Sequence, residues 1–155
     1  MTAKSLKTRQ HSSRSTTRKN NRGGGVSQKS FDGILKCMLE TLASIKLYHW
    51  NTFSYATHKA TDDIHESLSG NMDKYAEILL GKSDGKYRIN MRDFKTLNVS
   101  SVGNNKEMTN RVKKLISDLN KFHQGLKGDE YSDVNNVRDE IVGDLNKFLY
   151  LLTLK

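Results

Sequence analysis

Proline is absent from this chain of 155 residues, cysteine and tryptophan occur once each, and long apolar runs are missing. A single cysteine, Cys37, cannot form a disulfide within the chain, so a reducing compartment is expected. A membrane-spanning helix needs about 20 apolar residues, and the first long apolar stretch begins only at Phe31, so neither a span nor a signal peptide is predicted. The length suits one domain with one core.

Acidic residues are missing from the first 30 positions, although the whole chain holds 17. Eight basic residues lie in that stretch: Lys4, Lys7, Arg9, Arg14, Arg18, Lys19, Arg22 and Lys29. The other 18 basic residues nearly balance the 17 acids, so the net charge of +9 divides into a cationic tail and a nearly neutral remainder. Because residues 1–29 also have few apolar side chains, they are predicted to form a disordered basic tail before a folded domain at 30–155.

Four segments of the remainder carry apolar residues at the spacing of amphipathic helices, and no segment shows a strand pattern. The helices are expected at about 30–51, 55–80, 105–126 and 132–154, with Gly81 ending the second. Their core stripes are predicted, helix by helix, as Phe31, Leu35, Met38, Leu42, Ile45 and His49; Ala60, Ile64, Leu68, Met72, Tyr75 and Leu79; Met108, Val112, Leu115, Leu119, Phe122 and Leu126; and Val134, Val137, Ile141, Leu145, Phe148 and Leu152. A polar connection at 82–104 contains a short helical piece around 90–94. Short turns within each pair and a long connection between the pairs predict an all-α, ferritin-like four-helix bundle with a long crossover and up-down-down-up order.

Side chains that bind metals interrupt this pattern around the first turn. His49 occupies the apolar stripe of the first helix, and the second helix carries His58 four residues before Asp62 and Asp73 four residues before Glu77. Residues four apart project side by side from a helix. His58 and Asp73 are 15 residues apart and so lie roughly 22 Å apart along the helix, and one chain cannot bring both pairs to one ion.

Two copies of the second helix can assemble such a site if they pack antiparallel about a two-fold axis near Ser67 and Leu68. The His-Asp pair of one subunit then faces the Asp-Glu pair of the other, and Ser69 and Gly70 allow close approach. His65 lies on nearly the same face and is an additional candidate ligand. Mixed imidazole and carboxylate ligands suit iron, or alternatively zinc or manganese, better than calcium.

The same residues resemble the ferroxidase pattern of the Dps-type mini-ferritins. The resemblance is carried by His49-Trp50, His58-Lys59-Ala60-Thr61-Asp62 and Asp73-Lys74-Tyr75-Ala76-Glu77. It implies that both histidines and the first aspartate of one subunit bind iron together with the last two acids of its two-fold mate, and that these five residues are catalytic. It further implies oxidation of ferrous iron, storage of ferric mineral in a hollow dodecamer, and DNA binding by basic tails. Trp50 is expected to pack beside the site.

An alternative interpretation is a non-enzymatic ferritin-fold protein, structural or associated with nucleic acid, whose metal site is degenerate. In either case the tail favours sequence-independent DNA binding, because its charges can release counterions and no aromatic residue there can stack on bases. The tail could also serve solubility or targeting. Residues 18–24, Arg-Lys-Asn-Asn-Arg-Gly-Gly, are similar to basic segments of large DNA virus proteins. A virion-associated role therefore stands beside a cytoplasmic or nucleoid-associated one.

Overall fold

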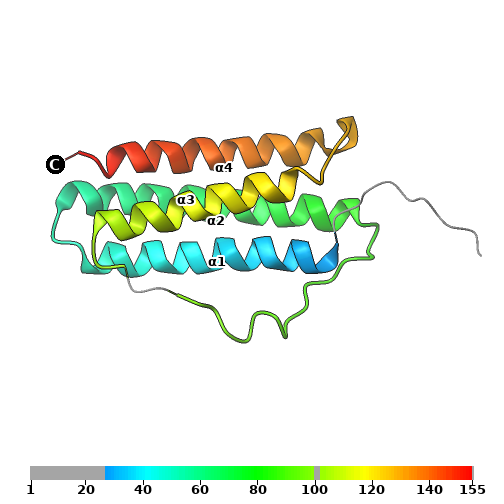
Figure 1. The fold of residues 1–155 in the computed structure, drawn as a ribbon, viewed down its shortest axis with the longest axis horizontal. Helices are drawn as coiled ribbons and strands as arrows, with labels where there is room; N and C mark the ends of the chain where they lie inside the picture. Colours follow the sequence, from blue (N-terminus) through cyan, green and yellow to red (C-terminus); the bar gives the residue numbers. More distant parts are fainter. Residues whose placement is uncertain (1–26, 100–101, 155) are drawn as a thin grey trace, which may run out of the picture.

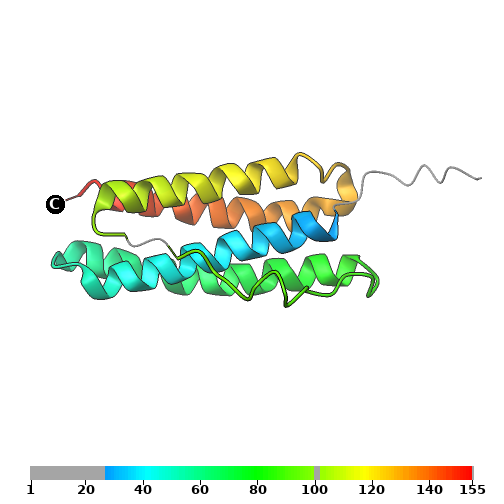
Figure 2. The ribbon, with the colours of Figure 1, turned by 60° about the horizontal axis from the view of Figure 1, so that its bottom comes forward.

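The structure, a computed structural model, describes residues 27–99 and 102–154, which form four long helices packed side by side (Figure 1). The helices are α1 (Gln28–Asn51), α2 (Tyr55–Lys82), α3 (Asn105–His123) and α4 (Ser132–Leu151), with a 3-10 turn η1 (Asp129–Tyr131) before α4. Helices α2 and α3 point the same way, and α1 and α4 run opposite to them (Figures 1 and 2). The predicted all-α bundle and its up-down-down-up order are therefore confirmed. None of the described helices is long and apolar enough to cross a membrane.

Local capping sets where the helices begin. The Ser27 hydroxyl accepts a hydrogen bond from the Ser30 backbone N–H, so α1 starts two residues before the predicted position. Lys29 consequently belongs to the first turn of α1, where it is exposed, and not to the tail. The other seven basic residues assigned to the tail lie outside the described residues. The same kind of cap, from Ser54 and Asn104, starts α2 and α3 where the sequence predicted.

The helix ends differ more from the prediction. Helix α2 continues through Gly81 because the chain leaves the helix only at Asp84 and Gly85, whose φ angles of 51° and 73° are left-handed. Helices α3 and α4 each stop three residues early, at His123 and Leu151. Leu126 nevertheless stays buried as predicted, since the turn after α3 folds it under the bundle.

Residues 83–104, here called the crossover segment, connect α2 to α3, and the described part at 83–99 runs along the outside of α1 (Figures 1 and 2). The short helix expected around 90–94 is absent, and hydrogen-bonded turns take its place. Two contacts hold this segment to α1: Lys36 Nζ donates to the Asp93 carbonyl at 2.9 Å, and the Asn98 N–H donates to Glu40 Oε1 at 2.9 Å. Arg111 of α3 reaches the same Glu40 carboxylate at 3.4 Å and donates to the Asn98 carbonyl at 3.5 Å. The segment is thus anchored to two helices.

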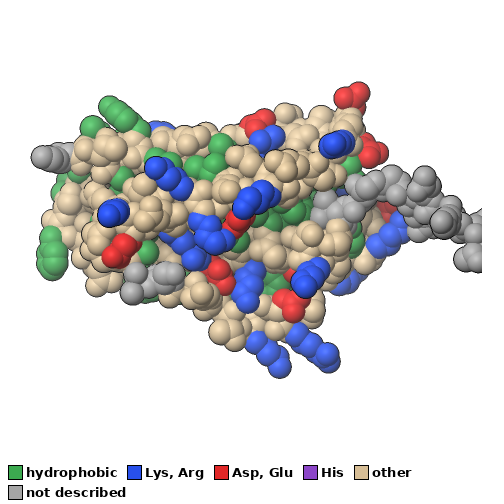
Figure 3. Space-filling model, viewed as in Figure 1, with side chains coloured by type: hydrophobic (Ala, Val, Ile, Leu, Met, Phe, Trp, Pro, Cys, Tyr) green, Lys and Arg blue, Asp and Glu red, His purple; other side chains and the backbone are tan. Residues whose placement is uncertain are grey.

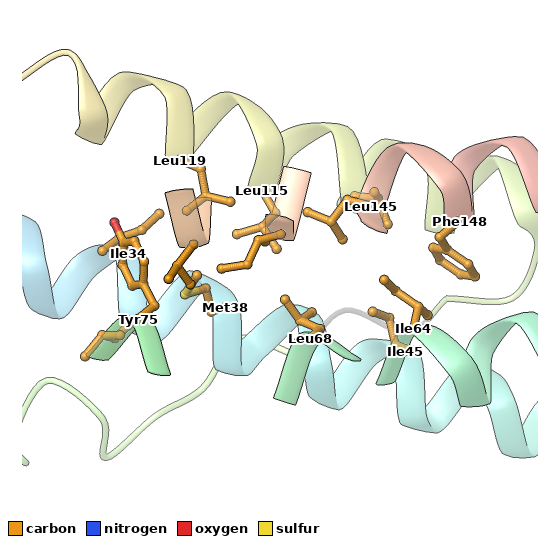
Figure 4. Packing of buried hydrophobic residues seen from close by; sticks show 14 of the residues in the cluster. Ile34, Met38, Ile45, Ile64, Leu68, Tyr75, Leu115, Leu119, Leu145 and Phe148 are labelled. Carbon is orange, nitrogen blue, oxygen red and sulfur yellow. The ribbon is translucent and has the colours of Figure 1, made fainter. Parts of the chain in front are cut away.

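All four helices contribute to one apolar core. Figure 4 shows Met38, Leu68, Leu115 and Leu145, one from each helix, pointing into the interior. The stripe predicted for the fourth helix is buried at every position: Val134, Val137, Ile141, Leu145, Phe148 and Leu152. In the other three helices the predicted stripes are buried except for three members that are only half-buried: Leu42, Met72 and Phe122.

A polar trio crosses the core between α2, α3 and α4, and the sequence suggested no role for its histidine. Tyr75 Oη lies 2.8 Å from His123 Nε2, and His123 Nδ1 lies 2.8 Å from Asn135 Oδ1. Because an amide oxygen only accepts, His123 Nδ1–H donates to it and the Tyr75 hydroxyl donates to Nε2. Burial lowers the pKa of His123 and raises that of Tyr75, so both side chains are neutral.

We expect the variant His123→Gln to reveal this arrangement through pH. The folded-state pKa of His123 lies below the ordinary histidine value of about 6.5, so protonation favours the unfolded chain and the contribution of His123 is lost as the pH falls below that value. Substitution should therefore lower the free energy of unfolding by about 1–3 kcal/mol near pH 7.5. Urea denaturation should show this difference shrinking near pH 5, and an equal difference at both pH values would contradict the assignment.

Candidate metal centre

The predicted ligands lie on one side of the bundle, here called the α1–α2 face. On α2, His58 stacks on His49 of α1, Asp62 forms an ion pair with Lys46 of α1, and Asp73 lines a groove with residues of α1. The opposite flank of α2 turns to α4, where Ser67 and Asn71 bond to Asp144 and Lys74 pairs with Glu140. The orientation of α2 about its own axis therefore turns His58, Asp62 and Asp73 toward α1 and turns Ser67, Asn71 and Lys74 toward α4.

The two histidines form a reciprocal pair at the α1–α2 turn. Only residues 52–54 separate the helices, so the last turn of α1 and the first turn of α2 lie at the same height. The rings stack with centroids 3.9 Å apart and planes 25° apart. His49 Nδ1 lies 3.1 Å from the His58 carbonyl, and His58 Nδ1 lies 3.2 Å from the His49 carbonyl. Since carbonyl oxygens only accept, both Nδ1 atoms carry a proton, and in the neutral form of each ring Nε2 keeps the lone pair.

In this tautomer each ring can bind a metal through Nε2 while a backbone carbonyl holds its Nδ1–H, an arrangement common among metal-binding histidines. Within the described residues neither Nε2 atom has a hydrogen-bond partner. The buried Thr61 hydroxyl donates to the carbonyls of Thr57 and His58 and lies 3.2 Å from His49 Nδ1. It therefore contacts both partners of the His49–His58 carbonyl hydrogen bond. Sequence reasoning missed Thr61, although its position three residues after His58 was a usable signal.

Lys46, for which the sequence suggested no role, lies beside Asp62. Lys46 Nζ lies 3.7 Å from Asp62 Oδ1 and 6.0 Å from the centre of the Trp50 ring. The pKa of His65 lies below its ordinary value because the ring is partly buried, and the Lys46 charge lowers it further. A cation that binds Asp62 must therefore compete with the Lys46 ammonium group.

The carboxylate pair is far from the histidines. Asp73 and Glu77 are exposed one turn apart near the other end of α2. Within residues 27–99 and 102–154, no three His, Cys, Asp or Glu side chains come together in a group that could hold a metal ion. One protomer thus keeps the histidine pair and the Asp73–Glu77 pair apart, as their spacing along α2 predicted.

Trp50 does not pack in the protomer as the sequence analysis expected. Its side chain is 67% exposed and touches the bundle through Lys46, and the neighbouring Leu47 is 42% exposed. At the other end of the same face, an apolar groove of about 320 Å³ lies open between α1, α2 and the crossover segment. Its apolar lining consists of Leu35, Leu39, Met72, Ala76, Ile89, Met91 and Phe94.

These features define an all-α four-helix bundle with a histidine pair near one end of α2 and two exposed carboxylates near the other. The chain belongs to the family of unknown function DUF5856, whose model matches residues 49–152 and so includes all six candidate ligands. It is 27% identical over 124 residues to the "Uncharacterized 14.6 kDa protein in mobD-ri intergenic region" of Enterobacteria phage T4, covering 80% of this chain and 88% of the phage protein. Neither description names a metal or an activity. No solved structure matches the chain.

The tautomers of His49 and His58 can be measured directly. We expect long-range proton–nitrogen NMR correlations to show both rings protonated at Nδ1 near neutral pH, because each Nδ1 faces a carbonyl. His65 provides an internal comparison, since no backbone carbonyl among residues 27–99 and 102–154 bonds to its ring. A spectrum in which either member of the pair carries its proton on Nε2 would contradict the geometry.

Proposed function

We propose that two copies of the chain associate through the α1–α2 face, with their α2 helices antiparallel, and bind ferrous iron between them. The observation that carries this proposal is the histidine pair, whose Nδ1 atoms are fixed on carbonyls while both Nε2 atoms remain available as ligands. Each of the two equivalent sites would combine His49, His58 and Asp62 of one protomer with Asp73 and Glu77 of its partner. Imidazole and carboxylate ligands suit iron, zinc and manganese.

Iron would be the substrate of this site. Two ferrous ions each give one electron to hydrogen peroxide, whose O–O bond breaks to yield two hydroxide ions. The chain's own residues contribute position and charge: the imidazoles hold the ions through Nε2, and the carboxylates balance the charge that increases on oxidation. Lys46 would leave Asp62 when an ion binds, because the two cations repel each other.

The spacing along α2 supports a two-fold arrangement. The midpoint between His58 and Glu77 falls between residues 67 and 68, and the midpoint between Asp62 and Asp73 falls at the same place. A two-fold axis at that height therefore places His58 of one protomer opposite Glu77 of the other, and Asp62 opposite Asp73. Charge agrees with this arrangement, because Lys46 lies at the histidine end and the other end holds two free carboxylates.

Apolar surface on the same face supports it as well. Because α1 and α2 are antiparallel, residues at the same height have numbers with a constant sum, which is about 107 for the contact of His49 with His58. Leu47 therefore lies at the height of Ala60. Rotation about the proposed axis, between residues 67 and 68, places residue 60 of α2 opposite residue 75 of the partner's α2. Leu47 and the adjoining Trp50 would then meet the partner's apolar groove at Ala76, which would cover two exposed apolar side chains and an open groove at once. A closed dodecamer that stores ferric mineral is the larger assembly implied by the resemblance to the mini-ferritins.

Complementation between two inactive variants tests the shared site. In His58→Ala dimers both sites lack an imidazole, and in Glu77→Ala dimers both lack a carboxylate, so ferric absorbance after adding ferrous iron and peroxide should rise more than about tenfold slower. A heterodimer of the two variants, isolated with two affinity tags, holds one intact site and one that lacks both groups. We expect about half the wild-type rate from it.

Asp63→Ala is the matched control, because Asp63 is adjacent to Asp62 but faces the α4 flank, where it pairs with Lys59. That variant should retain the wild-type rate. A heterodimer as slow as its two parents would reject a site shared between protomers, and wild-type rates in both parents would reject oxidation at this site.

A second function, sequence-independent DNA binding by the N-terminal basic segment, is favoured by the seven Lys and Arg and no acid in residues 1–26. Replacing all seven by Gln in the full chain should make the slope of log affinity against log salt shallower by about 6, because each phosphate contact contributes about 0.9. Iron oxidation should not change. An unaltered slope for a short DNA duplex would rule out the tail as the binding element.

A further inference from the structure

The folded bundle is almost neutral in total, but its charges separate between two faces. The crossover segment and α3 carry nine Lys and Arg against four Asp and Glu, whereas α2, η1 and α4 carry five against eleven. Figure 3 shows Lys and Arg spread across the face formed by α1, α3 and the crossover segment, with fewer Asp and Glu among them. The structure therefore has a basic face that net charge alone does not reveal.

Ion pairing differs between the faces in the same sense. On the acidic side, four of the five cations have a carboxylate partner at 2.9–3.3 Å: Lys59, Lys74, Lys82 and Arg138. On the crossover segment and α3, the cations that form an ion pair are Arg111, with Glu40, and Lys114, with Asp118. Seven exposed cations there have no carboxylate partner within the described residues: Lys86, Arg88, Arg92, Lys95, Lys106, Lys113 and Lys121. Their charges are available to an external anion.

The crossover segment presents its share of these cations from a fixed position. Its backbone is held to α1 by the Lys36 contact to Asp93 and by the Asn98 N–H contact to Glu40. Lys95 lies between these anchors and Arg92 directly precedes the first, so binding through them orders side chains without ordering the backbone. An anchored row of unpaired cations favours contact with a repeating anion.

We infer that the crossover segment and α3 form a binding surface for the phosphate backbone of duplex nucleic acid. The polyanion is favoured over an acidic protein because α1, whose first residue follows the basic N-terminal segment, belongs to this same face. A phosphate chain that runs along the face can continue onto that segment. The surface needs neither the metal site nor the tail, and it reads charge and not sequence.

A full-length variant with four neutralised cations, Arg88→Gln, Arg92→Gln, Lys95→Gln and Lys121→Gln, tests the surface. Binding to a short mixed-sequence duplex is measured by fluorescence anisotropy between about 50 and 200 mM salt. If all four cations contact phosphates, the slope of log affinity against log salt becomes shallower by about 3–4. Over that salt range the wild type then loses roughly a hundredfold more affinity than the variant.

The matched control, with the same net charge, neutralises four cations of the opposite face: Lys59→Gln, Lys74→Gln, Arg138→Gln and Lys147→Gln. Its slope should equal that of the wild type. Equal slopes in all three proteins would overturn the inference and leave binding to the tail. An equal decrease of the salt slope in both variants would also overturn it, because the effect would then depend on net charge and not on the position of the cations. A change of mass in solution for the Arg88, Arg92, Lys95 and Lys121 variant alone would contradict the inference, because it would show that the basic face binds the acidic face of another copy.

Lysine acetylation of the unmodified wild-type chain gives a second measurement that no folding defect can affect. Bound duplex should protect Lys95, Lys113 and Lys121 and leave Lys59 and Lys74 as reactive as in the free protein. Equal protection of both groups, or protection of neither, would contradict the proposed surface.

Discussion

His49 and His58 each donate a ring proton to the backbone carbonyl of the other, and the candidate site depends on this exchange. The contacts join the last turn of α1 to the first turn of α2 and hold the two rings 3.9 Å apart. They also fix the tautomer, because a carbonyl cannot donate. The same contacts that close the helical hairpin thereby leave the two Nε2 atoms with free lone pairs, so one local constraint serves both the fold and the coordination chemistry that we propose.

The helices and the core could be predicted from the sequence because both follow from the period of 3.6 residues. The spacing of apolar residues identified each helix and most of the buried apolar positions, although it missed Ile34, Tyr48 and Val102. The spacing of His58 and Asp73 showed that one protomer cannot bring both candidate pairs together. Helix ends were less predictable, since local caps and left-handed turns decide them. Ser27 and Gly85 are examples.

Contacts between helices were beyond the sequence, because they depend on how each helix is rotated against its neighbour. The Lys46 ion pair with Asp62, the exposure of Trp50 and the buried bond from Tyr75 to His123 are all of this kind. Charge distribution is another case. The nearly balanced composition of the folded part correctly predicted a small net charge, yet the fold assigns most acids to α2 and α4 and most unpaired cations to α3 and the crossover segment.

The central claim is that α2 packs antiparallel against its twin about an axis near residue 68. Spin labels on Lys59→Cys or Lys82→Cys, each in a Cys37→Ser background, measure this by pulsed dipolar spectroscopy. At 1.5 Å per residue, the account predicts distances between protomers of about 25–30 Å for the first label and about 45 Å for the second. Equal short distances at both positions, or no dipolar coupling at either, would contradict it.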